Sequence, residues 1–140
     1  MTIGTVYGVG LGPGDPDLLS VRADRLVRGA RHIAFFRKAG RPGQARTLAN
    51  DLLPADATEH PMEYPGTTEI PQSDPAYNEA LSAFYAECTK RLRVLTNAGE
   101  DVVVLCEGDP FFYGSFMHLY ARMKDDVPTH VGPAITGMSG

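Results

Sequence analysis

The sequence predicts an α/β protein, a three-layer domain with helices on both faces of a mostly parallel sheet of about five strands. Short β-prone apolar runs alternate along the chain with segments of helical periodicity. The clearest run, residues 102–106, is Val-Val-Val-Leu-Cys, which is typical of a strand buried on both faces. Glycine-rich turns follow three of the runs, at the strand ends where open parallel sheets bind ligands.

In the first part of the chain we expect a strand over residues 5–11, a turn at 12–16 and then a helix. Ser20 is a suitable N-cap for this helix, and Gly29 suits its end. Residues 33–36, Ile-Ala-Phe-Phe, form a second short apolar strand. A strand, a helix and a second strand in this order predict a parallel connection.

The middle of the chain contains a weak helix over residues 44–53 and a segment at 54–75 that is mostly ordered loop. Within that loop, residues 60–64 have short strand character. Asp74 and Pro75 then open the longest helix, as cap and first-turn residue, and it ends near residues 97–99. The rest of the chain predicts the strand at 102–106, a helix over 115–124 and a last strand at 129–131.

Composition and charge exclude several classes of function. Thirteen basic against seventeen acidic residues give a net charge of −4, so the chain offers no broad basic face for nucleic acid. No run approaches the roughly 18 apolar residues that span a membrane, and the N-terminus does not resemble a signal peptide. Two cysteines, Cys88 and Cys106, make no disulfide framework, so we expect a cytoplasmic protein and two inert buried thiols.

The first glycine-rich segment, residues 8–15, fits neither common phosphate-binding pattern. No glycine precedes Lys and then Ser or Thr, and both frames of the dinucleotide pattern fail, at Pro13 and at Asp15. The segment is either a tight turn between strand and helix or a place where a ligand approaches the backbone closely.

The second segment, residues 107–114, places Glu107 and Asp109 next to a buried strand and follows them with three aromatic residues. Carboxylates suit ribose hydroxyls or an ammonium group, and aromatic rings suit a flat ligand. The alternative is an aromatic plug in the core below an Asp-Pro turn.

Three motifs together resemble one family. Residues 9–19, Val-Gly-Leu-Gly-Pro-Gly-Asp-Pro-Asp-Leu-Leu, resemble the opening motif of the tetrapyrrole methylases, and residues 107–113 and 131–139 resemble their second and third motifs in the same order. The resemblance implies an S-adenosylmethionine-dependent methyltransferase that releases S-adenosylhomocysteine. Residues 106–117 are most similar to the members that methylate precorrin-2 at C20 in cobalamin biosynthesis.

The resemblance also assigns roles to residues. It implies cofactor contacts in all three motifs and a tetrapyrrole on the same rim, with Asp15 and Tyr113 lining the cleft. Arg37 and Lys38, which belong to a basic cluster with Arg41 and Arg46, are candidates to pair the acidic arms of the substrate, or else form a solvated loop. The implied cofactor-binding residues are Pro13, Glu107, Gly108, Asp109, Phe112, Thr136 and Gly137.

Two positions depart from the family pattern. Ala134 stands where glycine is usual in the third motif, and Phe36 stands where related uroporphyrinogen methylases have a proposed basic Asp. No catalytic base is therefore assigned. No metal site is expected either, because His32, His60, His118 and His130 have no zinc-like spacing to one another or to the cysteines.

Members of this family have two α/β domains, so we expect residues 1–140 to be the N-terminal domain, without the C-terminal one and inactive by itself. The resemblance implies a homodimer for the whole enzyme. The alternatives are a methylase of another tetrapyrrole position or of cobalt-precorrin-2, a non-catalytic adenosine- or nucleotide-binding module, and an isolated folding domain.

Overall fold

A computed structural model describes residues 3–11, 20–38, 40, 44–65, 74–106 and 114–132. It contains one sheet of five strands in the order β3-β2-β4-β1-β5, and every neighbouring pair is parallel. This confirms the predicted α/β class. The strands are β1 (Val6–Gly10), β2 (His32–Arg37), β3 (Thr58–Glu63), β4 (Val102–Cys106) and β5 (Thr129–Gly132), and the helices are α1 (Val21–Arg28), α2 (Gln44–Leu48), α3 (Pro75–Asn97) and α4 (Gly114–Met123).

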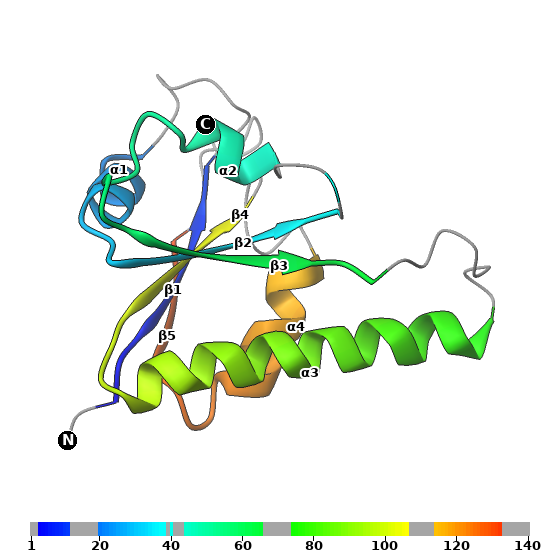
Figure 1. Ribbon diagram of the computed structural model, residues 1–140. Helices are drawn as coiled ribbons and strands as arrows, with labels where there is room; N and C mark the ends of the chain where they lie inside the picture. Colours follow the sequence, from blue (N-terminus) through cyan, green and yellow to red (C-terminus); the bar gives the residue numbers. More distant parts are fainter. Residues whose placement is uncertain are drawn as a thin grey trace.

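The helices cover both faces of the sheet, which confirms the predicted three layers (Figure 1). Alternate residues of each strand point to opposite faces. On one face Val9, Ile33 and Leu105 pack with residues of α1. On the other face Val104 packs with Leu92 of α3 and with the α4 residues Phe116, Leu119 and Met123.

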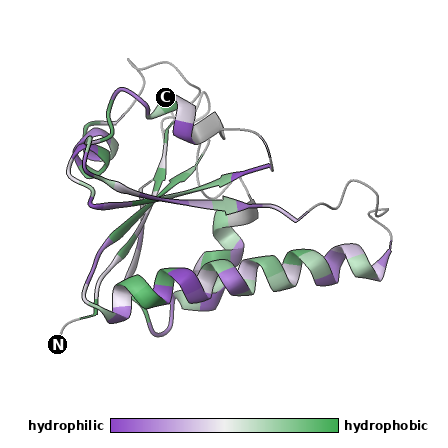
Figure 2. Ribbon diagram, viewed as in Figure 1, coloured by the Kyte–Doolittle hydropathy of each residue, from purple (hydrophilic) through white to green (hydrophobic). Residues whose placement is uncertain are grey.

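The centre and the edge of the sheet differ in character. All five residues of β4 are buried, as the uninterrupted apolar run predicts. In Figure 2 this strand is green along much of its length, whereas β3 is largely purple. Strand β3 lies at the edge and contains Pro61, a residue that edge strands tolerate because its missing N–H breaks no inner ladder.

Two helix starts follow the predicted caps. The hydroxyl of Ser20 accepts a hydrogen bond from the backbone N–H of Ala23 at 3.0 Å. The carboxylate of Asp74 accepts one from the N–H of Ala76 at 2.9 Å, with Pro75 as the first helical residue. Each side chain satisfies a donor that the helix leaves unpaired.

Helix α2 is shorter than predicted, because it ends at Leu48 and not at residue 53. After it the chain closes tight turns, in which the N–H of Asn50 donates to Thr47 O and that of Leu52 donates to Ala49 O. Pro54 disfavours helical backbone only at Leu53, the residue before it, so it does not account for the end of the helix at Leu48.

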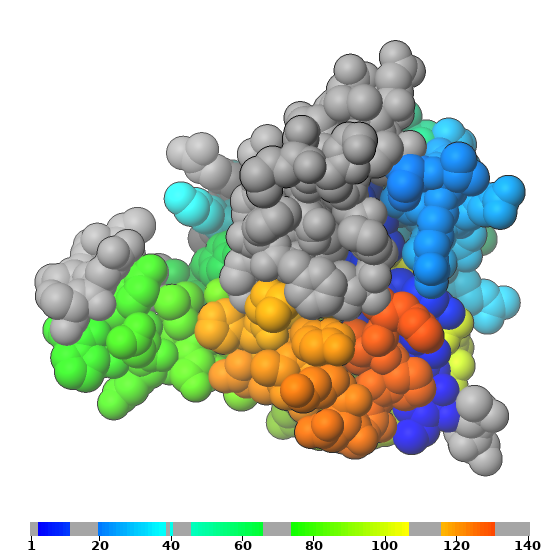
Figure 3. All heavy atoms as spheres, turned by 180° about the vertical axis from the view of Figure 1, so that it is seen from behind, coloured from blue at the N-terminus to red at the C-terminus, as the bar shows by residue number. Residues whose placement is uncertain are grey.

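Helices α3 and α4 lie side by side on one face, and Figure 3 shows α4 in orange between the green part of α3 and β5. The guanidinium of Arg93 on α3 donates to Arg122 O of α4 at 2.9 Å and to Asp126 Oδ1 at 3.1 Å. Because buried residues of α3 begin only at Tyr85, its second half anchors it, while its start projects past the strands (Figure 1).

Candidate functional site

The three glycine-rich segments leave three neighbouring strands. Strands β4, β1 and β5 are consecutive in the sheet, and each runs directly into one of these segments. At that edge the N–H of Leu11 donates to Cys106 O at 3.0 Å, which ties the ends of β1 and β4 together. The structure therefore confirms that the three strand ends from which these segments start are neighbours at one rim of the sheet.

The rim contains a topological switch point. Strand β1 leads to α1 on one face, whereas its neighbour β4 leads to α4 on the other face. Connections that depart in opposite directions leave a crevice between the strand ends, and ligands of open α/β sheets bind in such a crevice. The first and second motifs begin on its two sides.

The side chains predicted to contact the cofactor belong to these segments. Of the eleven predicted site residues, only Arg37 and Lys38 are among the residues that the structure describes. The others, Pro13, Asp15, Glu107, Gly108, Asp109, Phe112, Tyr113, Thr136 and Gly137, lie outside the described residues.

Gly8 has a packing role that differs from the ligand approach considered for the first glycine-rich segment. It lies within β1, and a Cβ built on it would be 2.3 Å from Cζ of Phe116, whose ring is fully buried. The absence of a side chain lets α4 approach the sheet directly below the rim. The close backbone approach at Gly8 is therefore to the protein's own core.

Arg37 and Lys38 lie at the carboxyl end of β2, next to β4. A guanidinium nitrogen of Arg37 lies 2.7 Å from an oxygen of Glu63, the residue paired with it in β3. Lys38 is exposed. Arg37 thus forms an ion pair at the edge of the sheet, and the solvated-loop alternative does not describe it.

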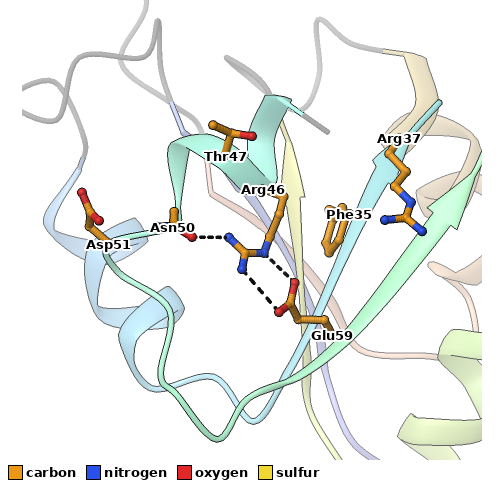
Figure 4. Close-up of a pocket in the computed structure, with 7 residues that line it drawn as sticks. All are labelled: Phe35, Arg37, Arg46, Thr47, Asn50, Asp51 and Glu59. Atoms are coloured by element: carbon orange, nitrogen blue, oxygen red, sulfur yellow. Dashed lines mark hydrogen bonds and ion pairs between the residues drawn. The ribbon is translucent and has the colours of Figure 1, made fainter. Parts of the chain in front are cut away.

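Arg46, a third member of the basic cluster, is fully engaged. Its guanidinium binds both oxygens of Glu59 and also Asn50 Oδ1, and these contacts hold α2 against β3 (Figure 4). The Arg46 guanidinium keeps the pKa of Glu59 below its ordinary value. Arg37 and Arg46 line the same hollow of about 480 Å³.

Phe36 belongs to an aromatic cluster that the sequence analysis missed. Its ring stacks on Tyr64 at 5.8 Å between centroids, and Phe84 of α3 lies 5.1 Å from Tyr64. The residue at the position of the proposed family base is thus part of an apolar contact between the sheet and α3. These residues come from separate segments, so only the fold brings them together.

A second missed contact joins two histidines that are distant in sequence. Nδ1 of His32 and Nε2 of His60 are 3.0 Å apart, and Nε2 of His32 lies 3.8 Å from Glu100. Burial, then the charges of His32 and Arg91, lower the pKa of His60. The pair lies on adjacent strands β2 and β3, and its spacing of 28 residues gives no local signal.

Within the described ranges, no group of three or more His, Cys, Asp or Glu side chains could hold a metal ion. Both thiols are buried, as predicted, and burial raises the pKa of Cys88 to about 11. No described helix is long and apolar enough to cross a membrane.

The fold defines a parallel α/β domain with a topological switch point at the ends of β1 and β4, the place where open α/β sheets bind ligands. Residues 5–140 match the model of the Tetrapyrrole (Corrin/Porphyrin) Methylases, and the chain belongs to this family. This confirms the resemblance carried by the three motifs.

Two curated relatives illustrate the match. The chain is 46% identical over 138 residues to a Precorrin-2 C(20)-methyltransferase from Sinorhizobium sp, which covers 99% of this chain and 56% of the relative. It is 39% identical over 136 residues to the Cobalamin biosynthesis protein CobIJ of Mycobacterium tuberculosis, covering 97% of this chain and 27% of the relative. The chain thus spans about half, or less, of the length of these relatives.

Solved structures show the same fold. Uroporphyrin-III C-methyl transferase from Thermus thermophilus, complexed with S-adenyl homocysteine, has a TM-score of 0.59 and 28% identity, over 96% of this chain and 50% of that one. Cobalt precorrin-4 methyltransferase has a TM-score of 0.65 and 22% identity, over 96% of this chain and 47% of that one. The second comparison supports the fold alone.

Proposed function

We propose that this chain is the cofactor-binding half of an S-adenosylmethionine-dependent methyltransferase that methylates precorrin-2 at C20 in cobalamin biosynthesis. The observation that carries the proposal is the topological switch point between β1 and β4, with the three family motifs starting at adjacent strand ends. The curated relative at 46% identity supports C20 over other positions, because siroheme synthases match over a similar span at only 34% or less.

The residue types in the three motifs suit the chemical groups of the cofactor. We propose that Gly108 and Asp109 bind its ribose and methionine parts, that Glu107 lies beside them, and that Phe112 contacts it through the backbone. Pro13 of the first motif and the Thr136–Gly137 pair of the third are proposed to complete the contacts. When bound, S-adenosylmethionine supplies an activated methyl group, and S-adenosylhomocysteine is the product.

What the chain itself contributes is alignment. A methyl transfer between two bound molecules gains most from holding donor and acceptor in the reactive orientation. A site built on strand ends suits this role because the strands below it are well packed: all five residues of β4 and all but Tyr7 of β1 are buried. Asp15, Tyr113, Arg37 and Lys38 are proposed to orient the tetrapyrrole, and no residue is assigned as the proton acceptor.

A chimera tests the activity. This chain replaces the matching N-terminal part of the Sinorhizobium relative, and methyl transfer to precorrin-2 is followed with labelled S-adenosylmethionine. We expect a product methylated at C20, and loss of transfer in Asp109→Ala but not in the matched surface variant Asp56→Ala. A product methylated at another carbon would overturn the substrate assignment.

The proposal also includes a homodimer, which the family resemblance implies, and a cytoplasmic location, which the lack of a disulfide framework suggests. Sedimentation of the active chimera tests the proposed homodimer. A monomer that retains full activity would contradict the proposed dimer.

A further inference from the structure

Arg37 lies beside the proposed methylation site. Phe35 of β2 pairs with Leu105 of β4, so Arg37 extends one residue beyond the level of Cys106, where β4 ends. Since neighbouring strands are about 4.8 Å apart, Arg37 is within a side chain's reach of the rim. It lies two strands from β1, on the same edge as the crevice.

The backbone and side chain of Arg37 are both held in place. The N–H of Tyr64 donates to Arg37 O at 2.9 Å, which extends the pairing of β2 and β3 by one residue. One terminal nitrogen of the guanidinium binds Glu63 at 2.7 Å. The side chain is 30% exposed, so the group is fixed in position while part of it faces solvent.

Arg37 retains donor capacity that Arg46 does not. Arg46 uses both edges of its guanidinium on Glu59 and Asn50. Among the described residues, Glu63 is the one carboxylate paired with Arg37, and the buried Arg37 Nε has no hydrogen-bond partner. A guanidinium has five donors, so donors on its exposed part remain for a ligand.

The charges around Arg37 are unevenly placed. The hollow itself is lined by two basic and two acidic residues, Arg37 and Arg46 with Asp51 and Glu59, and Arg46 is paired with Glu59. At the end of β2, Arg37 and the exposed Lys38 carry two positive charges against the one of Glu63. The hollow of about 480 Å³ beside Arg37 gives room for a short acidic arm. Figure 4 shows Phe35 between Arg37 and Arg46 in that view, and the Arg46 guanidinium turned toward Glu59 and Asn50.

We propose that Arg37 binds a carboxylate arm of the tetrapyrrole substrate and that Glu63 is its positioning residue. The inference rests on the proposed function, because it takes the substrate to be a polycarboxylate held at the rim. Arg37 would then determine how the macrocycle lies relative to the crevice, since a guanidinium and a carboxylate pair with defined geometry.

The test measures binding of uroporphyrin III, a stable tetrapyrrole polycarboxylate, by quenching of its fluorescence. Arg37→Gln should weaken binding about tenfold, the loss of one hydrogen bond between charged groups. Glu63→Gln keeps an acceptor for Arg37 but removes the competing charge, so binding should be retained or become tighter. The control Arg31→Gln removes an equal charge at the other end of β2, from a side chain 84% exposed, and should have no effect.

Two results would overturn the proposal. Equal affinities of Arg37→Gln and the parent protein would show that Arg37 contacts no carboxylate. Equal weakening by Arg37→Gln and Glu63→Gln would show that the pair only joins β2 to β3. S-adenosylhomocysteine binding is measured on the same variants: its absence in the parent protein contradicts the proposed cofactor, independently of the porphyrin result.

Discussion

Gly8 shows how one residue can serve the site without touching a ligand. Its missing side chain leaves space for the ring of Phe116, and this contact sets how closely α4 packs under the rim. In the sequence Gly8 is one of several glycines in a turn-rich stretch, and nothing local separates it from them. Its role depends on the packing of α4 across β1, which sequence spacing does not reveal.

Gly8→Ala should reduce the free energy of unfolding by about 1–3 kcal/mol, because the added methyl group overpacks a buried ring. Urea denaturation measures the change. In the double variant with Phe116→Leu, the smaller side chain gives the methyl group room. The double variant should therefore lose less unfolding free energy than the two single variants lose together. Strict additivity would contradict the contact.

The His32–His60 pair predicts a pH dependence of stability. Burial, with the nearby charges of His32 and Arg91, lowers the pKa of His60 below 6.5, so the unfolded chain binds this proton more tightly than the folded protein. The contribution of His60 to stability is therefore fully present above the pKa of the unfolded chain. It is lost as the pH falls below 6.5 toward the pKa of the folded protein. Glu100 and Arg31 are the other charged groups at this pair.

His60→Gln should remove part of that loss. Denaturation of both proteins between neutral pH and the acid side of the histidine range gives the slope of the unfolding free energy against pH for each, and the two slopes are compared. His130→Gln, a change at an exposed histidine of β5, serves as the control. An unchanged slope in His60→Gln would show that His60 titrates alike in the folded and unfolded chain.

At the scale of elements, local signals predicted the helix starts well. Ser20 and Asp74 act within three residues of their own positions, so the capping pattern contains all the needed information. Strand β4 was predicted equally well, because a strand that is buried on both faces has an uninterrupted apolar sequence. The end of α2 was predicted wrongly, since Leu52 continues the apolar period while the backbone has already turned.

The start of α3 should depend on its cap more than the rest of the helix does. Asp74→Ala removes a capping bond of about 1 kcal/mol, and the turns before Tyr85 contain no fully buried residue to offset the loss. Amide hydrogen exchange should therefore accelerate about fivefold before Tyr85 and remain unchanged beyond it. Asp56→Ala is the matched control, and uniform acceleration along α3 would contradict this account.

For the whole molecule, the alternation of strands and helices predicted a parallel sheet, and three glycine-rich strand ends predicted a rim. The strand order was not readable, because β4 inserts between β1 and β2 only through the long crossover of α3. That order decides that β1 and β4 are neighbours, and thus where the crevice lies. Contacts across the sheet, such as the one from Arg37 to Glu63, depend on the same order and register.

The central claim is that the rim between β1 and β4 binds S-adenosylmethionine or its product. Titration calorimetry with S-adenosylhomocysteine tests it most directly, with Asp109→Ala as the site variant and Asp125→Ala as the control. We predict saturable binding that Asp109→Ala weakens about tenfold and Asp125→Ala leaves unchanged. Binding of a nucleoside triphosphate in preference to S-adenosylhomocysteine, or equal affinity in Asp109→Ala, would contradict the account.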